Sequence, residues 1–179
     1  REGYGKLVNK SGILIEGYWQ PNGNCAYGRY FFPNGTYFEG NLKNNLPNIK
    51  GELKFYENNL YFGEWLNGEF HGKGSLFLTN KFKYEGNFSK SLFSGIGKLT
   101  FNDPEEYNYF YVGNFENNKF DGEGVFKYFK IKGNNNQEYK GNWKNGVPNG
   151  KGIYIWENGN IYEGCYEEGK KKGFRNFKT

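Results

Sequence analysis

Large apolar side chains alternate with glycine and polar residues along most of this chain. In the segment 61–65 (YFGEW), the odd-numbered residues share one face of a predicted strand and the even-numbered residues share the other. In the segment 72–78 (GKGSLFL), residues 72, 74, 76 and 78 again share a face. An alternation with a period of two predicts β-strands that bury one face.

This alternation belongs to an internal repeat. A tripeptide that begins with an aromatic or aliphatic residue and ends with glycine recurs at spacings of 23, 23, 23, 27, 28 and 23 residues. A large apolar residue follows each of these glycines by two positions, and a second glycine lies nine residues further on until Arg175 breaks the series. The tripeptides begin at Ile15, Phe38, Tyr61, Tyr84, Tyr111, Tyr139 and Tyr162. The large apolar residues are Trp19, Leu42, Trp65, Phe88, Phe115, Trp143 and Tyr166.

Each repeat predicts one two-stranded hairpin. The segments 67–71 (NGEFH) and 145–149 (NGVPN) have the composition of hairpin loops. A single hairpin is too small to be stable alone, so successive hairpins are expected to stack edge to edge in one antiparallel sheet. The glycines that alternate with aromatics leave room for a neighbouring ring to lie across the bare backbone. We therefore expect an all-β fold.

The two longer spacings mark inserted residues around 103–108 and 132–137. Both insertions fall between hairpins, so we expect longer turns that leave the register of the sheet unchanged. A domain boundary at these segments is the alternative, and the repeat resumes after each of them. We expect one repeat array over residues 1–179, with a partial repeat at 1–14.

Composition supports strands and disfavours helices. The chain has 28 Gly, 18 Phe, 16 Tyr and 4 Trp, whereas Ala26 is its one alanine. Such a composition argues against a helical bundle and against a doubly wound α/β domain. No apolar run approaches the roughly 18 residues of a membrane span. The absence of Met suggests an excerpt of a longer protein.

The formal net charge is +5, and it is concentrated near the end of the chain. Residues 139–179 carry 8 basic and 4 acidic groups, so they supply +4 of the total. A basic end is compatible with a membrane or nucleic-acid partner, and also with lysines that only solubilise the surface. Cys25 and Cys165 lie far apart without a CxxC motif, which is typical of reduced thiols in an intracellular protein.

The segment 61–74 (YFGEWLNGEFHGKG) resembles the MORN repeat, for membrane occupation and recognition nexus, commonly written YEGEWxNGxxHGxG. The resemblance covers nearly the whole chain, as about seven to eight repeats of 23 residues. Ala26, Leu42 and Ile49 depart from the pattern, so their repeats are expected to pack less regularly. The resemblance implies an elongated, twisted, single-layer sheet. It also implies scaffolding, membrane-proximal placement and dimerisation.

Residues with catalytic potential are few. The one histidine, His71, occupies the repeat's own histidine position and has an expected structural role in its hairpin. The glycine pairs lack the spacing of a phosphate-binding loop, and no cluster of His and Cys suggests a metal site. We expect neither enzymatic activity nor a cofactor. The repeated glutamates are expected to pair with lysines across strands. They are Glu16, Glu39, Glu85 and Glu163.

Candidate interaction residues lie outside the main apolar register. A sheet one layer thick leaves one face open to partners, and this face is expected to carry Phe31, Tyr37, Phe62 and Phe77. Dimerisation through the last repeat is expected to involve Tyr162, Tyr166 and Phe177. Weak contact with anionic lipid is expected at Lys170, Lys171, Lys172 and Arg175.

Together these features favour a non-catalytic scaffold that binds other proteins in a cytoskeletal or membrane-associated assembly. A targeting or regulatory arm of a larger enzyme is the alternative, because similar repeats precede lipid kinase and lysine methyltransferase domains. Direct binding of anionic phospholipid is a third reading. Binding of nucleic acid is disfavoured, because the aromatics repeat at positions that the fold itself needs. The expected location is the cytoplasm, at the cell cortex, the cytoskeleton or the membrane periphery.

Overall fold

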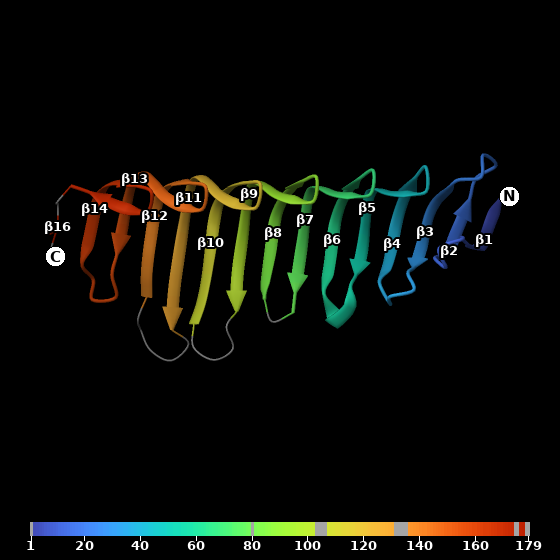
Figure 1. The fold of residues 1–179 in the computed structure, drawn as a ribbon, viewed down its shortest axis with the longest axis horizontal. Coiled ribbons are helices and arrows are strands. Elements are labelled where there is room, and N and C mark those ends of the chain that lie inside the picture. The colour runs from blue at the N-terminus through green and yellow to red at the C-terminus, as the bar shows by residue number, and fades with distance from the viewer. Residues whose placement is uncertain (1, 80, 103–106, 131–135, 174–175, 178–179) are drawn as a thin grey trace. The chain divides into compact units, whose positions relative to one another are not determined.

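The structure is a computed structural model that describes residues 2–79, 81–102, 107–130, 136–173 and 176–177. It divides into two compact units. Unit 1 contains residues 1–79 and 88–91, and unit 2 contains residues 80–87 and 92–179. Both units consist of antiparallel strands in sequence order (Figure 1), which confirms the expected all-β class of stacked hairpins.

Neighbouring strands in unit 1 pair antiparallel throughout. A short 3₁₀ turn, Tyr56–Asn58, joins the fifth and sixth strands. The strands are β1 (Gly3–Val8), β2 (Leu14–Trp19), β3 (Cys25–Phe31), β4 (Tyr37–Lys43), β5 (Leu46–Lys54), β6 (Leu60–Leu66) and β7 (Glu69–Leu78).

Unit 2 continues the same pattern, and β16 pairs with β14 beside the short strand β15. Part of β8 is assigned to each unit. The strands are β8 (Phe82–Ser89), β9 (Leu92–Asn102), β10 (Tyr107–Glu116), β11 (Lys119–Lys130), β12 (Asn136–Lys144), β13 (Val147–Ile155), β14 (Ile161–Glu167), β15 (Lys170–Lys172) and β16 (Asn176–Phe177).

The hairpin loops are shorter than the sequence suggested. Asn67 and Gly68 have φ angles of 51° and 87°, the left-handed pair of a type I′ turn, whose twist matches that of the flanking strands. Strand β7 begins directly at Glu69, and Phe70 and His71 pair with β6. The expectation of five-residue loops at 67–71 and 145–149 was therefore wrong, because two residues are enough to reverse the chain.

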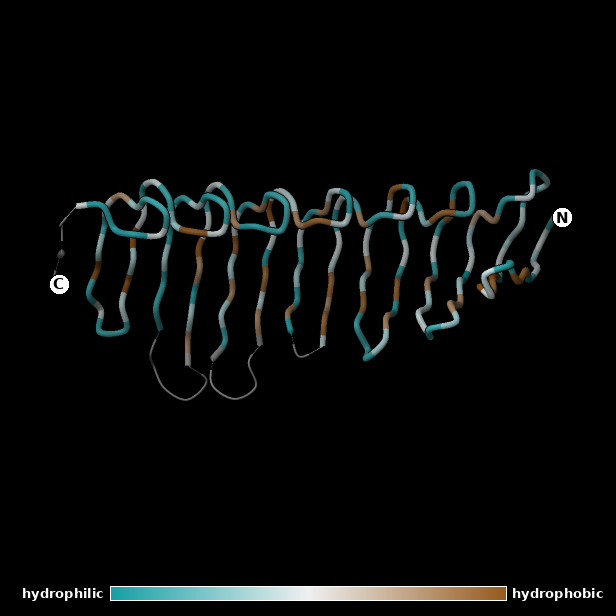
Figure 2. Tube along the Cα trace, viewed as in Figure 1, coloured by the Kyte–Doolittle hydropathy of each residue, from teal (hydrophilic) through white to brown (hydrophobic). Residues whose placement is uncertain are grey.

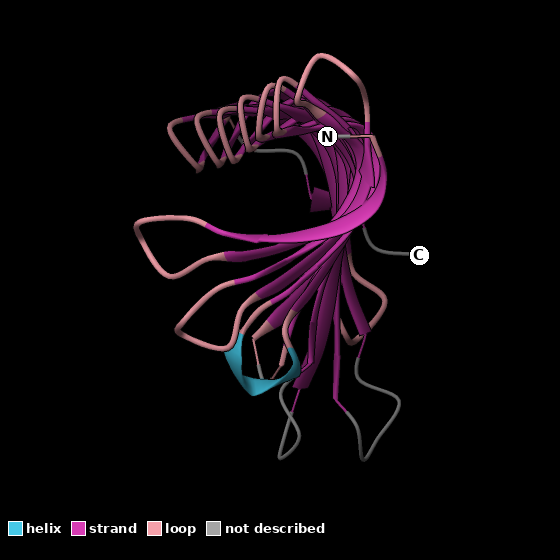
Figure 3. Ribbon diagram, turned by 90° about the vertical axis from the view of Figure 1, so that its right-hand side faces the viewer, coloured by secondary structure: helices cyan, strands magenta, loops and turns pink. Residues whose placement is uncertain are grey.

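The β6–β7, β10–β11 and β12–β13 hairpins each contain a β-bulge where the glycine pair begins. In β6–β7, Gly63 faces Gly74 while Glu64 faces His71, so the register shifts between them. Gly72 adopts a φ of 54° at this point, a conformation that glycine tolerates best. Figure 3 shows the strands bending near their tight turns, which fold over toward one side of the sheet.

The buried face of the sheet carries the repeat's own residues. All seven tripeptide starts and all seven large apolar positions predicted from the sequence are at most 8% exposed. Figure 2 shows apolar residues spaced along the strands, with hydrophilic residues at many of the turns. The glycines leave room for a neighbouring ring, as expected. A Cβ on Gly74 would lie 2.6 Å from the Tyr61 hydroxyl. The rings of Phe38, Tyr61, Tyr84, Tyr111 and Tyr139 each lie across a pair of glycines in this way.

Two recurring hydrogen bonds fix these side chains. The Tyr61 hydroxyl donates to the carbonyl of Glu64 at 2.7 Å, and Tyr111 donates to Asn114 at 2.9 Å in the same way. The Trp65 indole donates to the carbonyl of Gly51 at 3.1 Å, in the preceding hairpin. The tyrosine thus secures the bulge of its own hairpin, and the tryptophan joins neighbouring hairpins.

The inserted residues leave the sheet register unchanged, as expected. Gly113 faces Gly97 on one side and Gly124 on the other, and Gly124 faces Gly141. The inserted segments themselves, 103–106 and 131–135, lie outside the described residues.

Candidate interaction surfaces

The face opposite the buried tyrosines is called the outer face here. In unit 1 it brings together the four aromatic residues predicted from the sequence. One cross-strand row runs Phe31, Tyr37, Lys54, Leu60 and Phe77. The rings of Phe31 and Tyr37 lie 5.2 Å apart, and the Lys54 ammonium lies 5.8 Å from the Tyr37 ring centroid. The structure therefore places three of the four predictions in one continuous row.

Phe62, the fourth predicted residue, lies in the adjacent row. It faces Glu52 and Ser75 across the strands, and 47% of its surface is exposed. The Lys50 ammonium lies 5.2 Å from the centre of its ring, a cation–π geometry. The four predicted side chains thus share one face of unit 1.

A further row of exposed tyrosines was missed by the sequence reasoning. Tyr4 faces Tyr18, and Tyr18 faces Tyr27. The rings of Tyr4 and Tyr18 lie 5.4 Å apart in an edge-to-face arrangement. The signal was available, because each tyrosine lies next to a glycine of the buried face, where the period of two directs its side chain outward.

A charged row separates the two aromatic rows. Lys6 pairs with Glu16 at 3.2 Å, and Arg29 pairs with Glu39 at 3.2 Å. The pKa of Glu39 is lowered, first because the Tyr37 hydroxyl donates to its carboxylate and then because Arg29 lies beside it. The expected cross-strand lysine is found for Glu16, whereas Glu39 uses an arginine.

The other two repeated glutamates, Glu85 and Glu163, lie in surroundings that differ from those of the first two. Glu85 pairs with Lys83 of its own strand at 2.9 Å, and Glu163 faces Ile153 across the sheet. The expected pairing with a cross-strand lysine is therefore not general.

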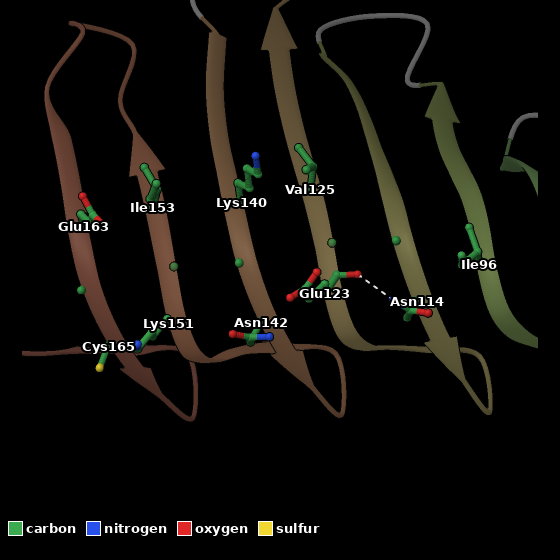
Figure 4. A pocket seen from close by; sticks show the side chains of 15 residues that line it. Ile96, Asn114, Glu123, Val125, Lys140, Asn142, Lys151, Ile153, Glu163 and Cys165 are labelled. Carbon is green, nitrogen blue, oxygen red and sulfur yellow. Dashed lines mark hydrogen bonds between the residues drawn. The ribbon is translucent and has the colours of Figure 1, made fainter.

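The outer face of unit 2 contains a groove across β9 to β14, with a volume of about 820 Å³. Five glycines form its floor, because the Cβ direction of each points to the buried face, so that bare backbone lies between the outward-facing side chains. They are Gly113, Gly124, Gly141, Gly152 and Gly164. Figure 4 shows two rows of side chains on either side of this floor.

The two rows mix charged, polar and apolar groups. One row places Val125, Lys140, Ile153 and Glu163 opposite one another across successive strands. The other row includes Asn142 and Lys151, and its Asn114 amide donates to the carbonyl of Glu123 at 3.3 Å. Ile96, at its end, is 67% exposed. The groove therefore presents charged groups of both signs and amide groups beside exposed aliphatic surface.

The predicted dimerisation residues occupy different environments. Tyr162 and Tyr166 are buried, at 3% and 5% exposed, so their rings pack inside unit 2. Phe177 belongs to β16, and its backbone pairs with Ile161 of β14.

The three lysines that were predicted to contact lipid also lie in different environments. Lys172 pairs with Glu167 at 2.6 Å, and Lys170 faces Glu167 across the strands. Lys171 lies over aromatic rings, and burial lowers its pKa. Arg175 lies outside the described residues.

The remaining candidate residues from the sequence are the histidine and the two cysteines. His71 is paired with Glu64 in the β6–β7 hairpin. Cys25 is a buried free thiol whose pKa burial raises, and Cys165 is an exposed free thiol. Among the described residues, no group of three or more His, Cys, Asp and Glu side chains could hold a metal ion. The described part of the chain also has no helix with the length and apolar character needed to cross a membrane.

Comparison with known proteins identifies the repeat. The MORN repeat family model matches residues 61–80, 84–103, 111–130 and 139–161. Alsin from Homo sapiens and Alsin from Rattus norvegicus are each 28% identical over 113 residues, which cover 63% of this chain and 5% of Alsin. The ALS2 C-terminal-like protein from Homo sapiens is 29% identical over 114 residues, which cover 64% of this chain and 9% of that protein.

The match therefore spans only a small part of the relatives' own length. The expectation of MORN repeats is confirmed for four repeats, and the larger count of seven to eight stays a prediction. Through residues 61–161, this chain carries MORN repeats, which are modules of protein interaction or membrane association.

Proposed function

We propose that this chain is a non-catalytic scaffold that binds a partner protein through the groove on the outer face of unit 2. The observation that carries the proposal is the glycine floor between two rows of exposed side chains. The buried tyrosines and tryptophans serve the sheet itself, so the outer face is the surface on which side chains are available to a partner. The MORN matches and the similarity to part of Alsin agree with an interaction module.

The groove chemistry favours a protein partner. Lys140 and Lys151 supply two positive charges, Glu123 and Glu163 supply two negative charges, and Ile153 adds aliphatic surface. A balanced set of charges beside apolar groups is suited to the mixed surface of a protein. We place the assembly at the cytoskeleton or the membrane periphery in the cytoplasm.

Charge reversal tests this proposal. In cells that make the full-length protein, the Lys140→Glu/Lys151→Glu variant should lose the partners that the tagged wild type retains. Lys50→Glu/Lys54→Glu, on the outer face of unit 1, is the matched control and should retain them. Both variants should fold with the circular dichroism of wild type, since all four lysines are outward-facing, and the control should melt slightly lower because it loses the ring contacts of Lys50 and Lys54. Equal retention by both variants would contradict the role of the groove.

A second candidate is a targeting or regulatory arm of a larger enzyme, of lipid kinase or lysine methyltransferase type. It is favoured by the length of the relatives, of which the matched segment is 5% or 9%. The full open reading frame separates the two candidates, because a catalytic domain beside the repeats would favour the arm.

Dimerisation through the C-terminal repeats and weak binding to anionic phospholipid remain proposals of lower rank. Tyr162 and Tyr166 are buried, so a dimer would use the backbone edge of β14 to β16 more than these rings. Lipid attraction is reduced by Glu167, which neutralises Lys172. A basic group near an anionic surface contributes roughly 1 kcal/mol, so attachment should be lost near physiological salt.

A further inference from the structure

Lys171 occupies a place that an aromatic residue holds in other hairpins. Phe120 faces Phe115 across its hairpin, and its ring stacks on Tyr111 with centroids 3.8 Å apart. In the last hairpin, Lys171 faces Tyr166 in the corresponding way. Its ammonium lies 4.9 Å from the ring centroid of Tyr162. A cation thus replaces the stacked ring.

Three aromatic rings surround this ammonium. Its nitrogen lies 3.7 Å from the centroid of Trp156, 4.9 Å from Tyr162 and 5.2 Å from Tyr154. All three distances are within the range at which the negative face of an aromatic ring attracts a cation. The rings of Tyr154 and Trp156 also contact each other, at 5.0 Å and an angle of 64°. The three side chains form an aromatic cage around one positive charge.

The cage is open to solvent. Lys171 is exposed, and Tyr154 and Trp156 are only partly buried, whereas Tyr162 forms the buried wall of the cage. The backbone around Lys171 is held by the pairing of β15 with β14 and by the Tyr162 hydroxyl, which lies 3.3 Å from the carbonyl of Lys172 and 3.2 Å from that of Gly173, so it does not depend on the Lys171 side chain. The side chain can therefore leave the cage without disturbing the rest of the sheet.

A quaternary ammonium suits such a cage better than a lysine does. A primary ammonium carries three N–H donors, and the aromatic faces cannot replace the water that those donors lose. A trimethylammonium group has no N–H donors and keeps its positive charge. It loses less hydration on entry, and its methyl groups fill the space between the rings.

We propose that Tyr154, Trp156 and Tyr162 form a binding site for a trimethylammonium group, which Lys171 occupies when no such ligand is bound. The ligand class is a choline-type quaternary ammonium, either free or as the headgroup of a choline lipid. This site lies on the buried-tyrosine side of the sheet, apart from the groove, so it is independent of the proposed protein partner.

The direct test uses Lys171→Ala, which empties the cage, and tetramethylammonium chloride as the probe. The indole N–H resonance of Trp156, assigned with Trp156→Phe, should shift and saturate. The apparent Kd should be at least about fivefold lower than for wild type, because a tethered side chain competes at a millimolar effective concentration. Lys172→Ala is the matched control, since it breaks the pair with Glu167 and leaves the cage filled. It should match wild type. A response of Lys171→Ala no larger than with sodium chloride would overturn the proposal.

A second measurement uses the wild-type sequence and does not depend on the variant folding. Reductive methylation with ¹³C-formaldehyde converts Lys171 to dimethyl-lysine, whose methyl resonance should be shifted upfield by the ring currents of the cage. Tetramethylammonium should displace the side chain and move this resonance toward that of the exposed lysines. If no methyl resonance is shifted upfield before the probe is added, Lys171 does not occupy the cage and the proposal is overturned.

The source of the ligand is then identified with two further probes on the same variant. Binding to phosphatidylcholine vesicles, but not to phosphatidylglycerol vesicles, would assign a lipid headgroup. Binding of choline chloride without vesicle binding would assign a free small molecule. If neither probe binds, the choline assignment is wrong.

Discussion

Tyr61 and Phe70 stack face to face, with ring centroids 3.7 Å apart and an angle of 9° between their planes. The Tyr61 hydroxyl is held at the same time by the carbonyl of Glu64. The ring is therefore fixed directly above Gly63 and Gly74, where any side chain would collide with it. The repeats that begin at Tyr61, Tyr84 and Tyr111 share this combination of a stacked ring, a hydrogen bond and a bare backbone.

Replacement of Gly63 by alanine should destabilise the protein by about 1–3 kcal/mol, because overpacking forces the neighbouring atoms to move. A Cβ there would lie 2.5 Å from the Tyr61 hydroxyl and 2.6 Å from the Cα of Gly74. Gly5→Ala is the matched control, since its Cβ would meet its nearest atom, Trp19 Cδ1, at 3.4 Å. Denaturant unfolding should show a clear loss for Gly63→Ala and little change for Gly5→Ala. Equal losses would contradict the assigned packing.

The period of the repeat was sufficient to predict the class of fold, the pairing into hairpins and the buried residues. It did not predict the bulge, because period-two reasoning treats Gly72 as an ordinary strand residue. The positive φ of Gly72 and the register shift beside it become visible only when both strands are present.

Ile49 should be a source of strain. It occupies the position of the first glycine of a repeat's pair, with a φ of 66°, which is unfavourable for a β-branched side chain. Ile49→Gly should therefore raise the free energy of unfolding by about 1 kcal/mol. Ile96→Gly is the matched control, because both isoleucines are 67% exposed and Ile96 does not have a positive φ. Thermal melts should move in opposite directions for the two variants, and a lower melting temperature for Ile49→Gly would disprove the strain.

The Tyr166 hydroxyl is buried without a hydrogen-bond partner among the described residues. Its removal in Tyr166→Phe should leave stability unchanged or increase it by up to about 1 kcal/mol, since no bond is lost and a buried polar group is removed. Tyr61→Phe loses the bond to Glu64 and should cost about 1 kcal/mol. The comparison is made by urea unfolding of both variants. A greater loss for Tyr166→Phe would mean that its hydroxyl has a partner.

Stability should fall at alkaline pH. Burial raises the pKa of Tyr30, Tyr84 and Tyr139 from 10.0 to about 12, so the folded state favours the neutral phenol. This contribution is complete below pH 10 and is lost as the pH rises toward about 12. Melting temperatures measured from pH 8 to pH 11.5 should decline less steeply for Tyr84→Phe than for wild type. Parallel curves would show that this tyrosine ionises with an ordinary pKa.

The candidate surfaces were only partly predictable. Phe31, Tyr37 and Phe77 were found because they break the main apolar register, and the structure adds that they form one row. The groove was not foreseen, because its lining residues are ordinary polar and aliphatic side chains from six strands. The aromatic cage was also missed, since Trp156 and Lys171 are distant in sequence and meet only through the pairing of β14 with β13 and β15.

The central claim, that the groove of unit 2 binds a partner protein, is tested most directly by photo-crosslinking in cells that make the full-length protein. A benzophenone side chain is introduced at Ile153, inside the groove, and separately at Asn22, in an exposed turn of unit 1. The account predicts a discrete crosslinked species from Ile153, absent from Asn22 and abolished by Lys140→Glu/Lys151→Glu. No crosslink at Ile153, or the same species from both sites, would contradict it.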